Sequence, residues 1–204
     1  YPNTLKVLKL TGGEVKEWLE MSAGQFQQIV PGSQDQLIIN PDFPSYNFDV
    51  IDGVNYQIDV SQKARYDKAG NLVEADSQRI QQLIYQGNAI DLDQEFLVVS
   101  NNYRASGGGN FPGIQADKIV IDAPNENRQT VADYLIYMTE QNPDNGFDPS
   151  ADNNWQFSPL AGTQVLFNGS ASQSALNFSE NSSNIEYSHI NDDGYAVYQI
   201  NLEP

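Results

Sequence analysis

The stretch "TLKVLKLTGGEVKEWLEMSAGQF", residues 4–26, joins a strand pattern directly to a helix pattern. At its start, Leu5 and Val7 alternate with polar neighbours, and Leu10 extends the apolar set. A period of two is typical of a strand that is buried on one face. The sequence therefore predicts a strand over residues 4–10.

The rest of this stretch, residues 11–26, predicts an α-helix. Thr11 and Glu14 have the spacing of a capping box, in which each side chain binds the backbone of the other residue. Apolar residues then recur at helical spacing, so we expect one face to enter the core. The residues of this face are Val15, Trp18, Leu19, Ala23 and Phe26.

Further strands follow a long connection. Proline, glycine, serine and asparagine dominate residues 30–45, which predicts a loop that Phe43 pins to the core. Three apolar stretches then indicate strands, and the last of them, a β-branched run, is typical of a strand buried on both faces. They are residues 54–60, 79–87 and 95–100.

A second helix is predicted over residues 125–141, "NENRQTVADYLIYMTEQ", with Pro143 beyond its end. Four apolar residues of this segment fall on one helical face, and we expect them to pack in the core rather than contact a cofactor. They are Val131, Tyr134, Leu135 and Met138.

The last part of the chain returns to strands, over residues 155–157, 163–167 and 194–202. Between them, the serine- and asparagine-rich residues 168–184 predict a mobile surface excursion. Two main helices among many strands, without strict strand–helix alternation, indicate an α+β fold with mixed or antiparallel sheets. We expect residues 1–204 to form a single domain.

Composition narrows the classes of partner. The chain has 204 residues, 39% of them hydrophobic, and a formal charge of −17 from 27 acidic and 10 basic residues. Such a charge repels nucleic-acid polymers and anionic membranes, so we expect neither as a partner. Cysteine is absent, which excludes disulfides and thiolate metal sites within the sequence. The start at Tyr1-Pro2, without methionine, suggests a piece of a longer, processed protein.

Catalytic chemistry has few candidates in this sequence. Its one histidine, His189, has no second histidine or cysteine with which to build a zinc centre, and no G-x-S-x-G motif is present. We therefore expect no catalytic residue and no metal ligand. Two acidic loops offer oxygen ligands for calcium but lack EF-hand spacing, so solvated turns are favoured. These loops contain Asp91, Asp93 and Glu95, and Asp144, Asp148 and Asp152.

The glycine-rich stretch "NNYRASGGGNF", residues 101–111, follows the predicted strand 95–100. Three consecutive glycines allow a close approach to the backbone, either by a ligand or within an ordinary turn. Tyr1 and Tyr103 each lie beside an asparagine at the edge of a predicted strand. Such a pair could clamp a planar ring while an asparagine amide binds its edge, or both tyrosines could pack in the core.

Five ordered blocks of the sequence resemble a known family. They are residues 1–26, 46–60, 97–113, 122–129 and 151–155, and the similarity resumes at residues 194–202. Together they resemble the C-terminal domain of the 5'-nucleotidase family, as found in the bacterial periplasmic bifunctional 2',3'-cyclic-nucleotide 2'-phosphodiesterase/3'-nucleotidases. The resemblance covers nearly the whole chain.

The resemblance implies a larger, periplasmic enzyme. In this family, a separate N-terminal metallophosphoesterase domain holds two divalent metal ions and the catalytic histidine, and a chain with a single histidine cannot contain that domain. The chain would then be the substrate-recognition half, without a cofactor of its own. We expect it to bind a nucleotide or nucleoside, to contact the metallophosphoesterase domain of the same polypeptide, and to be inactive alone.

The resemblance also implies the site. The nucleobase would stack between Tyr1 and Tyr103, and Asn3 would reach its edge. The turn that lines the pocket would consist of Arg104, Ala105, Ser106, Gly107 and Gly108. Many 5'-nucleotidases carry an aspartate after the double glycine that binds the ribose hydroxyls, whereas this sequence has Gly109. This difference fits substrates that are esterified at the 2' or 3' oxygen. Ser106 stands where close relatives are expected to have a tyrosine.

A function of a different class stays open at this point. An extracellular carbohydrate-binding or adhesion module would also expose tyrosines, which stack on sugar rings, and would bind calcium through acidic loops. Histidine-rich metal motifs upstream of this chain would favour the nucleotidase. Calcium-dependent stabilisation together with glycan binding would favour the module.

Overall fold

The computed structural model describes residues 2–144 and 146–203. Tyr1, which the resemblance places in the base clamp, lies outside these residues. The strands are β1 Thr4–Thr11, β2 Gln36–Leu37, β3 Asn55–Ile58, β4 Ile80–Tyr85, β5 Asn88–Ala89, β6 Glu95–Asn101, β7 Ile119–Glu126, β8 Trp155–Phe157, β9 Gln164–Gly169, β10 Ile185–Ile190 and β11 Ala196–Asn201. The α-helices are α1 Gly12–Ser22, α2 Asn102–Ala105, α3 Asn127–Gln141 and α4 Gln173–Glu180.

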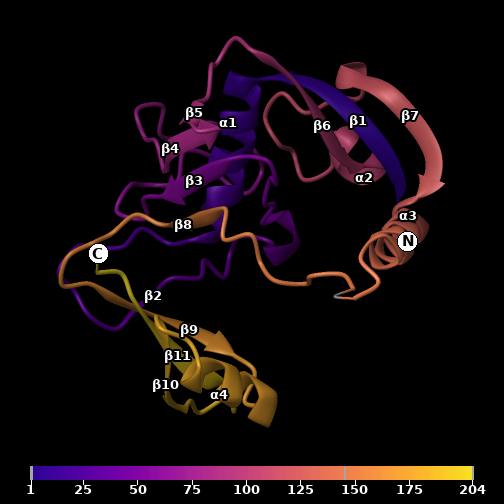
Figure 1. Ribbon diagram of the computed structural model, residues 1–204. Helices are drawn as coiled ribbons and strands as arrows, with labels where there is room; N and C mark the ends of the chain where they lie inside the picture. The colour runs from indigo at the N-terminus through magenta and orange to yellow at the C-terminus, as the bar shows by residue number, and fades with distance from the viewer. Residues whose placement is uncertain (1, 145, 204) are drawn as a thin grey trace.

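The strands form three small sheets, ordered β6-β1-β7, β5-β4-β3-β8 and β10-β11-β9-β2. Most neighbouring strands are antiparallel, whereas β2 pairs with β9 and β3 with β8 in parallel. The α+β class with mixed and antiparallel sheets is therefore confirmed. In Figure 1, α4 lies beside the sheet that contains β9, β10 and β11, and this sheet lies below the other two. None of the helices in the described ranges is long and apolar enough to cross a membrane.

Helix α1 begins with the predicted capping box. The Glu14 backbone N–H donates to Thr11 Oγ1 at 3.2 Å, and the Thr11 N–H donates to Glu14 Oε2 at 2.8 Å. The helix lies between two core clusters, because Val15 and Trp18 pack against one sheet and Leu19 against another. One helix thus joins the sheet that contains β1 to the sheet that contains β3.

Strand β1 is the middle strand of its sheet, with β6 and β7 as antiparallel neighbours. Its deepest side chains are Leu8 and Leu10, which belong to the core cluster around Trp18. Leu5 and Val7 lie on the opposite face, where Val7 is also buried. The alternation was therefore predicted, but Leu8, and not Leu5 or Val7, packs with Leu10 in this cluster. A shift of one residue exchanges the two faces of a strand.

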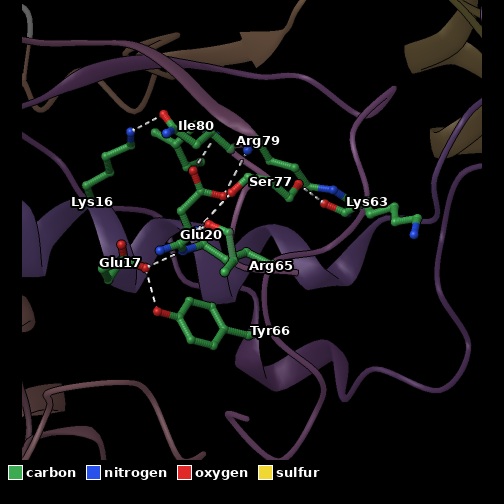
Figure 2. A network of polar contacts seen from close by, with 11 residues as sticks. Lys16, Glu17, Glu20, Lys63, Arg65, Tyr66, Ser77, Arg79 and Ile80 are labelled. Atoms are coloured by element: carbon green, nitrogen blue, oxygen red, sulfur yellow. Dashed lines mark hydrogen bonds and ion pairs between the residues drawn. The ribbon is translucent and has the colours of Figure 1, made fainter. Parts of the chain in front are cut away.

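A network of buried polar groups fastens α1 to β4, as Figure 2 shows. The Glu20 carboxylate accepts hydrogen bonds from the backbone N–H groups of Arg79 and Ile80, each at 2.9 Å. The Arg79 guanidinium donates to the carbonyl oxygens of Ala23 at 2.7 Å and Phe26 at 2.6 Å. Burial lowers the pKa of Arg79 to about 10, so the side chain stays charged at neutral pH.

Three further expectations need correction. Strand β6 is an edge strand with exposed Leu97 and Val99, and not a strand buried on both faces. Helix α3 is present, but its apolar face is not part of the core, because none of its residues is buried. The polar segment 168–184 contains α4, which Ser172 caps by accepting a hydrogen bond from the Ala175 N–H.

Candidate functional site

Tyr103 forms an exposed aromatic surface on α2. Its ring lies against the backbone of Gly108, where an added Cβ would be 2.5 Å from Tyr103 O and 2.6 Å from the ring atom Cε1. A side chain at position 108 would therefore collide with the ring, which explains the glycine. The residue remains 51% exposed, so the ring can stack on a ligand.

Two asparagines before Tyr103 fix the start of α2. The Asn101 side chain caps the helix by accepting a hydrogen bond from the Arg104 N–H at 2.9 Å. Asn102 Oδ1 accepts a hydrogen bond from the Thr4 N–H at 3.0 Å and thereby ties the helix to β1. The backbone that carries Tyr103 is thus anchored to the central strand of its sheet.

Arg104 is buried beneath this loop. Its guanidinium forms a two-point ion pair with Asp49, at 2.7 Å from Nε and 3.0 Å from Nη2, and stacks on the Phe111 ring at 3.9 Å from the centroid. It also donates to Asn47 Oδ1 at 3.2 Å and to the Gly108 carbonyl. These contacts direct the guanidinium into the protein, where it supports the loop from below.

The other predicted loop residues have different environments. Ala105 is fully buried in the core cluster, whereas Ser106 is exposed and Gly107 and Gly108 are half-buried. Gly109 has a φ of +81°, and an added Cβ would be 2.6 Å from Asn47 Oδ1 and would also collide with the Arg104 guanidinium. The loop therefore leaves no room for an aspartate at position 109 in this conformation.

Asn3 lies at the same end of the sheet as Tyr103. The β1–β6 register pairs Leu5 with Asn101, and Thr4 then contacts Asn102, so Asn3 and Tyr103 are the next residues of the two segments. Asn3 is half-buried, and its carbonyl accepts a hydrogen bond from the Asn127 N–H at 2.9 Å. Asn3 and Tyr103 therefore both follow the same end of the β1–β6 pair, and their joint role in base binding stays a prediction.

Two hollows border this end of the sheet. A hollow of about 470 Å³ is lined by Pro2, Asn3, the last residue of β7, Glu126, and the first two residues of α3, Asn127 and Arg128. A groove of about 860 Å³ runs between β6 and residues 48–54 and ends at Asn101 and Arg104. Tyr103 is not among the residues that line either hollow.

Sequence reasoning missed the residues that the end of β7 and the start of α3 contribute to the hollow beside Asn3. Glu126, Asn127 and Arg128 lie in a block that carries the family resemblance, but the pattern assigned them only to a helix. In the structure, Asn127 Oδ1 is buried, and no residue in the described ranges donates a hydrogen bond to it. A buried amide oxygen without a hydrogen-bond partner is unusual in proteins. This oxygen belongs to the residue whose backbone binds Asn3, so the hollow beside Asn3 contains a polar group whose hydrogen-bonding capacity is not satisfied.

The acidic side chains near the site bind the protein itself. Asp49 pairs with Arg104 and also accepts a hydrogen bond from Trp18 Nε1 at 2.8 Å. In the two acidic loops, Asp91 Oδ1 accepts from the Asp93 N–H at 3.0 Å, and Asp148 Oδ1 accepts from the Ser150 N–H at 2.9 Å. Over residues 2–144 and 146–203, no group of three or more His, Cys, Asp or Glu is placed to hold an ion. The site offers stacking and hydrogen bonding.

Comparison with known proteins identifies the family of this chain. Residues 1–116 match the family described as 5'-nucleotidase, C-terminal domain. The chain is 49% identical, over its whole length, to the trifunctional nucleotide phosphoesterase YfkN of Bacillus subtilis, and spans 14% of that protein. It is 44% identical, over 99% of its length, to the 2',3'-cyclic-nucleotide 2'-phosphodiesterase/3'-nucleotidase of Haemophilus influenzae, of which it spans 31%. The chain thus spans a third or less of these relatives.

Solved structures show the same fold. A putative 5'-nucleotidase from Staphylococcus aureus superposes with a TM-score of 0.58 and 27% identity, over 77% of this chain and 28% of that protein. A 5'-nucleotidase precursor from Thermus thermophilus superposes with a TM-score of 0.52 and 20% identity, over 76% of this chain and 25% of that protein. The chain therefore belongs to the 5'-nucleotidase C-terminal domain family.

Proposed function

We propose that this chain is the nucleotide-recognising domain of a periplasmic phosphoesterase that hydrolyses 2',3'-cyclic nucleotides and 3'-nucleotides. The relatives with these names are 43% to 44% identical to the chain. The alternative of a carbohydrate-binding module with calcium loops has no comparable support, since family membership favours a nucleotidase.

The exposed Tyr103 ring is the observation that carries the proposal. Gly108 supports one part of the ring and the Asn102–Thr4 hydrogen bond fixes its backbone, so the ring is held in place before any ligand arrives. A fixed ring loses little conformational entropy on binding, which favours stacking of a flat nucleobase. Tyr1 would supply the second ring of the clamp.

Asn3 would recognise the edge of the base. Its amide carries both a donor and an acceptor, and the hydrogen bond from Asn127 holds its backbone in place. Stacking accepts every base because each has a π-face, so the amide would add orientation rather than strict selection. This combination fits an enzyme that acts on several nucleotides in nucleotide catabolism.

The acidic character of the chain fits recognition of the base and sugar only. A formal charge of −17 repels phosphate, so the phosphate would be held outside this chain. We propose that a metallophosphoesterase domain of the same polypeptide holds two divalent ions, which would supply the attacking water and neutralise the phosphate. This chain would deliver the nucleotide to them and would be inactive alone.

A titration of this chain with 3'-AMP, followed by NMR, tests the proposal. One stacking contact stabilises binding by about 1 to 3 kcal/mol, so the affinity of the chain alone should be millimolar or weaker. We expect saturable shifts at Asn3 and Tyr103 that disappear in Tyr103→Ala and persist in Tyr103→Phe. Ribose 3-phosphate, which lacks the base, should not produce them.

Tyr195→Ala provides a matched control. Tyr195 is 55% exposed between β10 and β11, in a different sheet from the proposed site, so its removal should leave the titration unchanged. If Tyr103→Ala binds 3'-AMP as the unmodified chain does, Tyr103 does not stack on the base. If the base-free sugar produces the same shifts, the site does not recognise the base.

A further inference from the structure

Helix α3 has an apolar face that the rest of the described ranges leaves largely uncovered. Four residues at helical spacing form this face, which we call the α3 stripe. They are Val131, Tyr134, Leu135 and Met138, of which the first three are exposed and Met138 is half-buried. Val131 is 58% exposed, close to the 59% of Ile136 on the opposite side of the helix, whereas Leu135, at 37%, and Met138 are partly covered, so the stripe is only partly covered.

A helix with an uncovered apolar face needs another surface to pack against. Isolated helices shorter than about 12 to 15 residues are marginal in water, and in proteins most helical stability comes from burial of an apolar face. Helix α3 has 15 residues and no buried one. Its start is held by the Asn127–Asn3 hydrogen bond, and Figure 1 shows the helix at the periphery, beside the end of β7. The stripe lacks the partner that would stabilise it.

The composition of the stripe and the net charge of the chain point to a protein partner other than a second copy. Aromatic residues and methionine are enriched in the buried centres of protein interfaces, and the stripe contains Tyr134 and Met138. A second copy would bring another formal charge of −17, and the repulsion between the two would oppose association. The covering surface therefore belongs to a different domain or protein.

The lengths of the relatives indicate where that surface comes from. This chain spans 31% of the Haemophilus influenzae relative and 32% of the Salmonella typhimurium relative, so most of each polypeptide lies outside the matched segment. In addition, α3 begins at Asn127, whose N–H binds Asn3 in the proposed base site. A domain that acts on the bound nucleotide would have to approach this side of the chain.

We propose that the α3 stripe is the surface on which the metallophosphoesterase domain of the same polypeptide docks. This inference rests on the proposed function, because it assumes that domain. Docking buries the stripe, stabilises α3, and places the first turn of the helix between the base site and the docked domain.

Hydrogen exchange in the full-length polypeptide, compared with this chain alone, tests the proposal without measuring activity. We expect the amides of residues 131–141 to exchange about tenfold more slowly, or slower still, in the full-length polypeptide, because local opening there would also break the docking contact. Equal exchange in the two proteins would overturn the proposal.

A pair of matched variants locates the contact. Val131→Asp places a charge in the docked interface, so docking should weaken by about a hundredfold. The added protection of α3 from hydrogen exchange should then be lost. Ile136→Asp introduces the same charge on the opposite side of α3, at a position of equal exposure, and should preserve the protection. In this chain alone, the two variants should have similar melting temperatures. Loss of protection in both variants would show that the stripe is not the contact.

Two further outcomes separate this proposal from others. If this chain alone dimerises, and Val131→Asp makes it monomeric, the partner is a second copy and the proposal is wrong. If 3'-AMP binds through Tyr103 while α3 exchanges equally in both proteins, the docking proposal fails and the proposed function stands. If α3 is protected and Tyr103→Ala binds 3'-AMP normally, docking stands and the base site is wrong.

Discussion

Glu20 of α1 binds main-chain groups at the start of β4, and Arg79, just before β4, binds main-chain groups just beyond the end of α1. The Glu20 carboxylate accepts hydrogen bonds from the N–H groups of Arg79 and Ile80, while the Arg79 guanidinium binds the carbonyl oxygens of Ala23 and Phe26, just beyond the end of α1. Both side chains are almost completely buried. The pair therefore satisfies main-chain groups that would otherwise be buried without partners.

Replacing Glu20 should destabilise the fold strongly. In Glu20→Ala, two buried N–H groups lose their acceptor, and Arg79 loses a nearby negative charge, so we expect a loss of about 3 to 5 kcal/mol. Urea denaturation measures the free energy of unfolding. Glu140→Ala, on the exposed side of α3, is the control and should change stability by less than about 0.5 kcal/mol. Similar values for the two variants would show that the network contributes little.

The pH dependence of stability should carry a signature of Glu20. Burial raises the pKa of this carboxyl in the folded state, so the folded protein binds a proton more tightly than the unfolded chain. Between the unfolded pKa, about 4.3, and the raised folded pKa, stability should therefore fall as pH rises. The difference in unfolding free energy between the unmodified chain and Glu20→Gln should decrease across this window. A difference that increases with pH would contradict a raised pKa.

Restoring an aspartate at position 109 should not be tolerated. Gly109→Asp would place a Cβ against Asn47 and the Arg104 guanidinium at a φ of +81°, and we expect a loss of about 2 to 4 kcal/mol from strain and overpacking. Gly87 has nearly the same φ, +82°, with nothing within 4 Å of an added Cβ. Gly87→Asp therefore reports the backbone cost alone and should destabilise less, which thermal melts of both variants can check.

Gly108→Ala should impair base binding through Tyr103. The added methyl group collides with the Tyr103 ring and would displace it, so the affinity for 3'-AMP should fall by about tenfold, comparable to the loss of one stacking contact. Gly13→Ala is the control, because an added Cβ there meets its nearest neighbour at an ordinary 3.4 Å. Unchanged affinity in Gly108→Ala would mean that the position of the ring does not govern binding.

Local signals in the sequence predicted where helices and strands form better than they predicted which side chains are buried. The capping box at Thr11 and Glu14 depends on nearby residues alone and was confirmed. The helical spacing after it correctly predicted α1, but the helix ends at Ser22, before Ala23 and Phe26. The exposure of Leu97 and Val99 was not predictable, because an apolar run looks the same at the edge of a sheet as in its middle. For the same reason, the apolar face of α3 indicated a helix but not whether a partner covers it.

The candidate site was predicted in part. The resemblance named Asn3 and Tyr103, and the strand register shows that both follow the same end of the β1–β6 pair, which sequence spacing cannot show. Asn127 was missed because its link to Asn3 depends on the pairing of β1 with β7. The inward direction of Arg104 was also not predictable, since its partners Asn47 and Asp49 are far away in sequence.

The two parallel strand pairs have a consequence for folding kinetics. Strand β3 pairs with β8 and β2 pairs with β9, so segments about 100 and about 130 residues apart in the chain must meet. During synthesis, neither sheet can be completed until the last third of the chain has been made, and until then the edges of β2 and β3 remain open. We expect slow folding, with a partly ordered intermediate in which α1 and β1 are formed first.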